Sequence, residues 1–533
     1  MTETRARDDG TPRASGRRLP LLPLAVVLVG WFAVPAAVTI GRGIGELSWV
    51  ASSQSRAGLV SLVWLIGVGT GTALLAAVAA RSLAAWRSPG PAVAVLLVPA
   101  GLTMAGVAVA WRLAFAFRPA GRDQVGVVNA VVDAAGVAPV SWLTQEPLVG
   151  AVVLGAALVW VLVGPAATFL LVVHRRDPAR PLPRWPEVGS SWRRALLLVA
   201  LVAGLVALRS HDLVRVATGG SFGTATLSSE SIERTIVAGQ DARGAALATV
   251  LLVATTVIAL GVASVVTSAR DLVEPAARGG RHRARPAAGD RPGALLQGLV
   301  AIGLVVWALP AVGVVVTAIR PADAVASSGW WAALTDPDLT LDGLRTVLGD
   351  GVDGGMWEAT LRTFALTIPV VAVVLALAAS AGTAICELDR RARRRLTAVL
   401  VGAAAAPRAA VLPPMVDLLD AAGVRGSLPA VWVAQAGLVL PLATLLVIWR
   451  APIAAVAALV WVVAWGDYLV GAALLDGDGP VAVHVAELVA AHGEDPRLAA
   501  AGTVAAALVP LVVLVVGGVA TLGRRTEPTG TTA

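Results

Sequence analysis

The chain carries few residues of the kinds that do covalent or phosphoryl chemistry. All 42 basic residues are arginine, so the phosphate-binding loop that ends in Lys-Ser or Lys-Thr cannot form. Cys386 is the only cysteine, which excludes an intrachain disulfide. His492-Gly-Glu494-Asp495 could supply metal ligands, but adjacent residues in a polar segment are more typical of a solvated loop. We therefore predict no catalytic residue, no cofactor and no metal site, and we expect that the chain is not an enzyme.

Charged residues inside apolar runs are the other candidates for function. Arg408 falls within such a run, where a charge costs about 2.5–3.5 kcal/mol unless it faces protein or water. Two interpretations stay open: Arg408 faces a solute pathway, or the run is two shorter helices around Pro407 with Arg408 in a wet gap. Asp467 and Tyr468 lie toward one end of another run, where we favour anchoring at the membrane interface.

The elements that position these residues are membrane-spanning helices. The chain is 57% hydrophobic and 14% charged, whereas a soluble domain is about a quarter charged. A spanning helix needs roughly 20 apolar residues, and such runs recur from end to end. Gly67-Val-Gly69-Thr-Gly71 lies inside one of them, which favours close helix packing over nucleotide binding. We predict an all-α polytopic membrane protein with about twelve spans, at 21–40, 57–80, 91–114, 147–173, 195–212, 244–268, 294–318, 359–385, 397–415, 428–449, 453–475 and 498–522.

The arginines are unevenly distributed over the segments between these spans. Most lie in alternate, shorter segments, and the positive-inside rule then places both termini in the cytoplasm of a multi-pass protein of the cell (inner) membrane. Because the arginines follow topology, we predict no binding of nucleic acid. The small residues at Val34-Pro35-Ala36-Ala37 would suit cleavage of a leader peptide, but the topology closes only if the first span is retained.

A basic segment rich in glycine and proline divides the chain into two halves. Its central part, from Arg278 to Pro286, has too few apolar residues to form a hydrophobic core. This composition indicates a cytoplasmic tether whose arginines contact anionic membrane lipids. The predicted organisation is an N-terminal tail, a first transmembrane half, this linker, a second transmembrane half and a C-terminal tail, at 1–19, 20–270, 271–293, 294–523 and 524–533.

Four motifs follow one another in the first half. They are Trp111-Arg112-Leu113, Gly126-Val-Val-Asn129, Val140-Ser-Trp142-Leu143 and the segment that runs from Asp212 to Thr218-Gly219-Gly220. In this order and at this spacing, they resemble the larger permease subunit of sugar-type ABC importers, the maltose-transporter kind. The second half contains motifs that resemble the smaller subunit of the same importers. They are Trp307-Ala-Leu-Pro310, Leu339-Thr-Leu-Asp342, Leu412-Pro-Pro414 and Trp465-Gly-Asp467-Tyr-Leu469.

This resemblance implies a fused pair of permease subunits that usually occur as two chains. It also implies two partners, a separate ABC ATPase and an extracytoplasmic solute-binding protein. Small solutes of the sugar class would cross between the halves by alternating access.

The segments that should receive force from the ATPase depart from the family pattern. Its E-A-A-x-x-x-G docking loop is absent from both halves. In the second half only Arg450 and one neighbour separate two spans, too few for a docking helix. In the first half the loop persists but holds four prolines; its candidate ATPase-facing residues are Arg175, Arg176, Trp185 and Glu187.

Two alternatives follow from these departures. One is a degenerate membrane protein that keeps the permease fold without coupling to an ATPase. The other is a secondary carrier of the major-facilitator type, which also has twelve spans and a central cytoplasmic tether. The loop between the second and third spans, Arg81 to Gly90, contains no acidic residue and so lacks that family's signature.

Overall fold

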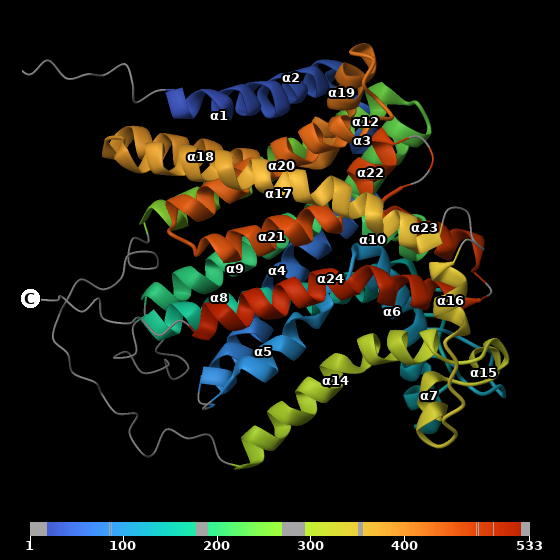
Figure 1. The fold of residues 1–533 in the computed structure, drawn as a ribbon. Helices are drawn as coiled ribbons and strands as arrows, with labels where there is room; N and C mark the ends of the chain where they lie inside the picture. The colour runs from blue at the N-terminus through green and yellow to red at the C-terminus, as the bar shows by residue number, and fades with distance from the viewer. Residues whose placement is uncertain are drawn as a thin grey trace, which may run out of the picture.

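Every regular element that the structure describes is a helix (Figure 1). This computed structural model describes residues 19–523 apart from 85, 87, 177–189, 269–293, 350–354, 476, 478 and 494. Among these residues, eight helices are long and apolar enough to cross a membrane, and four bent helix pairs bring the number of candidate spans to as many as twelve. The prediction of an all-α polytopic membrane protein is confirmed.

The candidate spans form two successive sets of six. The first set consists of the helix from α1 (Leu22–Val27) to α3 (Leu47–Ser53), α4 (Ser55–Ala84), α5 (Gly90–Leu97) with α6 (Met104–Ala114), α8 (Pro147–Arg176), α9 (Ser190–Arg209) with α10 (Asp212–Thr218), and α12 (Asp241–Ser268). The second consists of α14 (Ala294–Ala318), α17 (Gly355–Glu387), α18 (Arg390–Ala405) with α19 (Arg408–Ala421), α20 (Leu428–Ile448), α21 (Ile453–Trp465) with α22 (Tyr468–Leu474), and α24 (Pro496–Gly523). In both sets, the third and fifth spans are the bent ones.

Polar helix caps inside apolar runs accompany these bends. Thr103 precedes α6, and its hydroxyl accepts a hydrogen bond from Gly106 N at 3.0 Å. Asp467 precedes α22 and accepts one from Val470 N at 3.2 Å. Such caps satisfy backbone N–H groups that begin a new helix. Pro407, which holds its own φ at −71° and disfavours helix at the residue before it, separates α18 from α19 by a bend of 82°.

Glycines allow two helices of the first set, α4 and α9, to approach closely. A Cβ on Gly69 in α4 would lie 2.7 Å from the carbonyl oxygen of Ala200 in α9. On the facing helix, a Cβ on Gly204 would lie 2.7 Å from the Leu65 side chain. Within Gly67-Val-Gly69-Thr-Gly71, the prediction of close helix packing is therefore confirmed at Gly69, whereas a Cβ on Gly67 would meet no atom within 4 Å.

The first span of each set packs against the other set (Figure 1). In α2 (Val34–Gly43), the Thr39 hydroxyl donates to the Ala410 carbonyl at 2.7 Å. Arg42 at the end of α2 pairs with Asp417 of α19, also at 2.7 Å. In the opposite direction, α14 packs against α5 and α6 and accepts, at the Trp307 carbonyl, a 2.9 Å hydrogen bond from the Trp160 indole of α8. The two sets are thereby interlocked.

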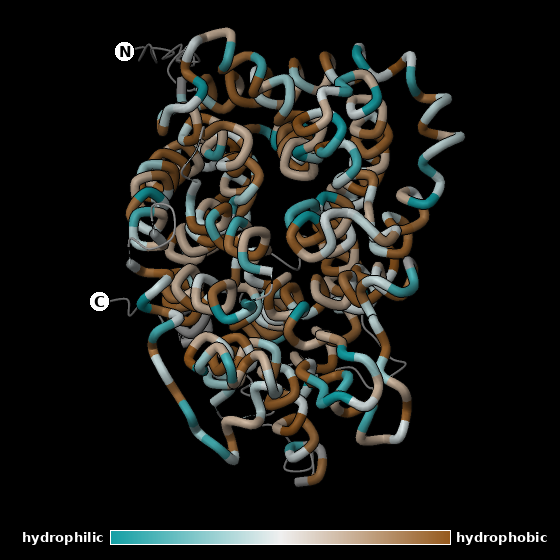
Figure 2. Tube along the Cα trace, turned by 90° about the vertical axis from the view of Figure 1, so that its right-hand side faces the viewer, coloured by the Kyte–Doolittle hydropathy of each residue, from teal (hydrophilic) through white to brown (hydrophobic). Residues whose placement is uncertain are grey.

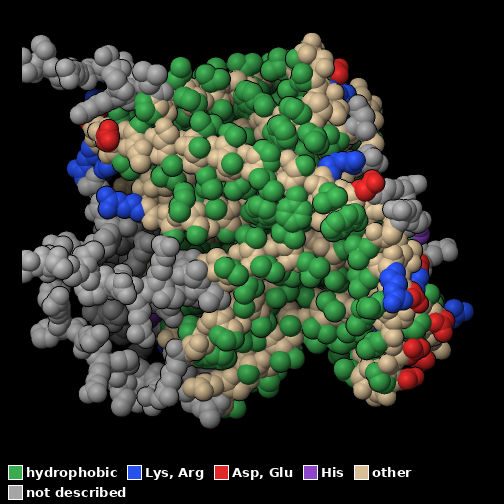
Figure 3. Space-filling model, viewed as in Figure 1, with side chains coloured by type: hydrophobic (Ala, Val, Ile, Leu, Met, Phe, Trp, Pro, Cys, Tyr) green, Lys and Arg blue, Asp and Glu red, His purple; other side chains and the backbone are tan. Residues whose placement is uncertain are grey.

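The ends of the spans define two faces of the molecule. On the terminal face, α1 begins and α24 ends (Figure 1). The opposite loop face carries α7 (Val127–Ala134), α15 (Ala322–Ser327), α16 (Asp342–Leu348) and α23 (Val481–Ala491). Figure 3 shows a wide hydrophobic belt between these faces, with charged side chains mainly toward the two edges. Viewed onto the loop face, the spans are seen end-on, and hydrophilic residues concentrate in the segments that connect them (Figure 2).

Candidate solute path between the two sets of spans

Three of the four bends meet in a cluster of ionisable and aromatic side chains. We call Arg209, His211, Asp212, Arg408, Asp467 and Tyr468 the break cluster. Arg209, at the end of α9, donates to the Ala404 carbonyl near the end of α18 at 2.6 Å. The His211 ring, just before α10, stacks on Tyr468 of α22 with centroids 6.2 Å apart. These contacts join the first set to the second at the points where their helices break.

Arg408 and Asp467 form an ion pair within the break cluster. Arg408 Nη1 lies 3.0 Å from Asp467 Oδ1, and the Asp467 residue is only 3% exposed. Of the two interpretations of Arg408, the structure shows the two shorter helices around Pro407, with the guanidinium paired at the break. The expectation that Asp467 anchors the chain at the membrane interface is wrong, because its carboxylate is enclosed and serves both Arg408 and the Val470 N–H.

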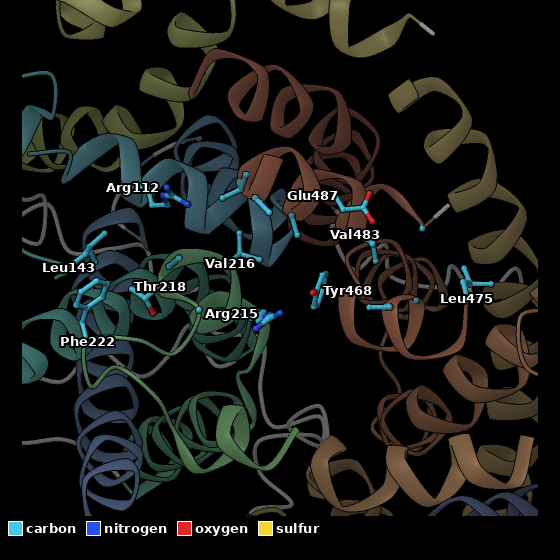
Figure 4. A pocket seen from close by; sticks show the side chains of 18 of the residues that line it. Arg112, Leu143, Arg215, Val216, Thr218, Phe222, Tyr468, Leu475, Val483 and Glu487 are labelled. Atoms are coloured by element: carbon cyan, nitrogen blue, oxygen red, sulfur yellow. The ribbon is translucent and has the colours of Figure 1, made fainter. Parts of the chain in front are cut away.

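A cavity of about 660 Å³ lies between the two sets on the loop-face side of these bends (Figure 4). The first set contributes Arg112 of α6, Arg215 and Thr218 of α10, and residues that follow α10. The second set contributes Tyr468 of α22, and Glu487 comes from α23, the short loop-face helix that precedes α24. Arg408 does not line this cavity, so its role as a pathway residue remains a prediction.

The charged groups of this cavity differ in how they are paired. Arg215 Nη1 lies 3.0 Å from Glu233 Oε2, so its charge is compensated locally. Glu487 Oε2 lies 3.6 Å from His484 Nδ1 on its own helix. Arg112 is partly buried and has no hydrogen bond or ion pair to any residue within the described ranges.

A smaller cavity of about 210 Å³ lies beside it and shares Arg112. Arg320, which follows α14, lines this cavity and donates to the Ser328 and Gly329 carbonyls and to the Ser328 hydroxyl. Burial lowers the pKa of Arg320, while the carboxylates of Asp338 and Asp336 act in the opposite direction. This guanidinium is thus engaged with the backbone around α15, in contrast to Arg112.

Three of the four first-half motifs meet around a hydrogen-bonded turn on the loop face. Asn129 is fully buried, and its amide nitrogen donates to the Ala116 carbonyl at 2.9 Å and to the Val140 carbonyl at 3.0 Å. Its amide oxygen accepts from Val140 N and from the Trp142 indole, each at 3.0 Å. Trp111 stacks on Phe115 at 5.0 Å. These residues hold the segment that follows α6 and so position Arg112.

The remaining motif residues also have structural positions. Asp212 opens α10 and contacts the His211 ring at 3.2 Å. Gly219 and Gly220 end α10 with φ of +64° and +76°, a conformation that favours glycine. Trp465 is buried and donates from its indole to the Ala506 carbonyl at 2.9 Å. Sequence reasoning had not proposed Arg215 or Glu487, although a charge within or beside an apolar helix is itself a signal of function.

The predicted ATPase-facing residues lie at the terminal face or outside the described residues. Arg450 has φ of +56° between α20 and α21; its N–H bonds the Val447 carbonyl, and Ala451 N–H bonds that of Leu446. This is a Schellman turn, which leaves no room for a docking helix. Arg175 and Arg176 end α8, but their side chains are not among those described; Trp185 and Glu187 lie outside the described residues.

The chain is similar to three transport permeases, while no protein-family model matches it. It is 29% identical to the osmoprotective compounds uptake permease protein GgtC of Synechocystis sp., over 36% of this chain and 73% of GgtC. It is 26% identical to GgtD of the same organism, over 39% of this chain and 82% of GgtD. It is 27% identical to the alpha-glucoside transport system permease protein AglF of Rhizobium meliloti, over 30% of this chain and 51% of AglF. Each relative corresponds to only part of this chain, as a fusion of permease subunits requires.

Proposed function

Because this chain is a homologue of sugar and osmoprotectant ABC permeases, we propose that it forms the entire membrane path of an importer in one fused polypeptide. As a permease component of an ABC-type importer for a small solute, it would carry a sugar or a related osmoprotectant. The observation that carries this proposal is the cavity of about 660 Å³, whose walls come from both sets of spans.

The interlocked sets support transport by alternating access. A cavity that lies on one side of the bends, with the break cluster on its other side, corresponds to a path open toward one face only. We assign the loop face to the outside and the terminal face to the cytoplasm, because the arginine-rich segments adjoin the terminal face. A solute-binding protein would then dock on the loop face, which carries α7, α15, α16 and α23.

The ATPase would engage the cytoplasmic side asymmetrically. The turn at Arg450 has no docking helix, so we assign the contact to the first half, where Arg175, Arg176, Trp185 and Glu187 were predicted to face it. The three relatives are permeases of ABC type, which favours this arrangement over a major-facilitator carrier. A degenerate permease without coupling is the second candidate, and the Schellman turn at Arg450 is the observation that favours it.

Uptake by cells tests the proposal and separates the two candidates. Cells that lack this gene are complemented with it, and uptake of radiolabelled maltose and of sorbitol, a neutral polyol, is measured before and after ATP depletion at constant membrane potential. We expect ATP-dependent uptake of at least one solute, together with copurification of an ATPase with the chain. Absence of both uptake and copurification would support the degenerate candidate, and uptake that follows the proton gradient would support a secondary carrier.

A further inference from the structure

We propose that Arg112 and Glu487 select the solute in the larger cavity, and that this solute is a polyhydroxylated molecule without net charge. The inference rests on the proposed function, because it takes the cavity to be part of the solute path. It goes further in naming two residues and a charge state. Neither residue forms part of the break cluster or of the Asn129 turn.

Arg112 presents an uncompensated guanidinium to the cavity. The side chain is partly buried, lines both cavities, and contacts no acceptor among the described residues. A charged group that is partly removed from water requires compensation by water or by a ligand. A guanidinium offers five N–H donors in a planar fork, which suits two neighbouring oxygen atoms of one ligand. Hydroxyl groups on adjacent carbons provide such a pair.

Glu487 supplies the complementary acceptor from the other set of spans. Its side chain is 57% exposed and lines the larger cavity, and the 3.6 Å between its Oε2 and His484 Nδ1 is too long for a strong hydrogen bond. Figure 4 shows Arg112 and Glu487 on different helices around the same opening. A solute between them would accept from the guanidinium and donate to the carboxylate, and a molecule with several hydroxyl groups does both without carrying charge.

The charges along the described wall favour a solute with no net charge. Arg215 is neutralised by Glu233 at 3.0 Å, which leaves Arg112 and Glu487 with opposite signs. An anion or a cation would gain from one of these groups and lose to the other. The Thr144 and Thr218 side chains add further polar groups to the wall. Neutral polyols can use all of these groups at once.

The size and the apolar surface of the cavity fit the same class of solute. Its volume of about 660 Å³ falls within the range of about 300–1,000 Å³ that is typical of small-molecule sites, whereas the neighbouring cavity of about 210 Å³ does not. The rings of Phe222 and Tyr468 and the Val216 side chain also line it. These surfaces suit the C–H faces of a sugar ring.

Binding to the full-length chain in lipid nanodiscs tests the inference. Isothermal titration calorimetry would compare maltose as the neutral probe with gluconate as an anion and glycine betaine as a zwitterion. We expect maltose to bind most tightly, Arg112→Met to weaken it at least tenfold, and Glu487→Gln to weaken it at least threefold. Arg112→Lys should fall between wild type and Arg112→Met, because it keeps the charge and loses the planar fork. Arg345→Met, on exposed α16, is the matched control and should bind as wild type.

The outcomes separate this inference from the proposed function. Thermal unfolding establishes that each variant is folded; if Arg112→Met is not, Arg112→Lys and Glu487→Gln decide. Maltose affinity within twofold of wild type in the folded variants would overturn the inference while leaving transport intact. Tighter binding of gluconate or betaine than of maltose by tenfold would also overturn it. A wild-type chain that binds no probe, in cells that take up none, would overturn both proposals.

Discussion

The ion pair between Arg408 and Asp467 is stabilising only while both partners are present. Asp467 is almost fully buried, so removing Arg408 leaves an uncompensated carboxylate. Breaking a buried pair of this kind costs about 3–5 kcal/mol, whereas replacing both partners by apolar residues costs much less. We predict that Arg408→Met and Asp467→Leu each lower the unfolding temperature strongly and that the double variant recovers much of the loss. Thermal unfolding of the four proteins as a double-mutant cycle measures this coupling; additive effects would contradict it.

Arg450 illustrates a different contribution of a single residue, that of its backbone conformation. A residue with a Cβ pays about 1–2 kcal/mol in the left-handed region, whereas glycine does not. Glycine also gives the unfolded chain more conformational entropy, which lowers the free energy of unfolding by roughly 0.5–1 kcal/mol. We therefore predict that Arg450→Gly raises the free energy of unfolding by up to about 1 kcal/mol. Arg450→Ala removes the same charge but keeps the Cβ. A rise in unfolding temperature for both variants alike would show that the charge, and not the φ angle, is responsible.

At the scale of elements, Asn129 determines the conformation of the segment between α6 and α8. Its amide makes four hydrogen bonds, and Asn129→Ala would leave the half-buried Val140 N–H and Trp142 indole without this acceptor. An unsatisfied buried polar group costs about 1–3 kcal/mol. We therefore predict that the variant loses at least about 2 kcal/mol and that limited proteolysis cuts the segment 115–146 sooner. Gly126→Ala should act similarly, because a Cβ there would overlap the Ala116 backbone; unchanged proteolysis in both variants would contradict the prediction.

The spans were predictable from sequence, whereas their bends were only partly so. Long apolar runs identify helices directly, and all twelve predicted runs correspond to a candidate span or to a bent pair. Proline is an ambiguous signal: Pro407 separates two helices, while Pro165 and Pro369 lie inside continuous ones. The pairing of Arg408 with Asp467 joins residues 59 positions apart. A contact between such distant positions leaves no local sequence pattern. The two charged residues could therefore be identified from the sequence, but their ion pair could not.

At the scale of the whole molecule, the contacts that the first span of each half makes with the other half predict that assembly does not need the linker. The span that contains Thr39 and Arg42 is bound to α19, and α14 is bound to α5 and α6, so the first span of each half contacts the other half as well as its own. We predict that residues 1–280 and 281–533, expressed as separate chains in one cell, copurify and complement uptake. Affinity purification through a tag on one chain, followed by detection of the other, measures this association.

The contacts of the first span with the other half also predict which deletion separates the halves. Removing residues 1–46 from the first chain deletes Thr39 and Arg42, and with them the 2.7 Å contacts to Ala410 and Asp417. It also deletes Trp31 and Phe32, which pack against α20 and α19. Recovery of the partner chain should then fall severalfold. Shortening the chain by residues 1–18 alone should leave recovery unchanged, since the packed helix begins after them. Equal recovery with both truncations would mean that the remaining contacts, those of α12 with α18 and of α24 with α5 and α6, hold the halves together without the first span.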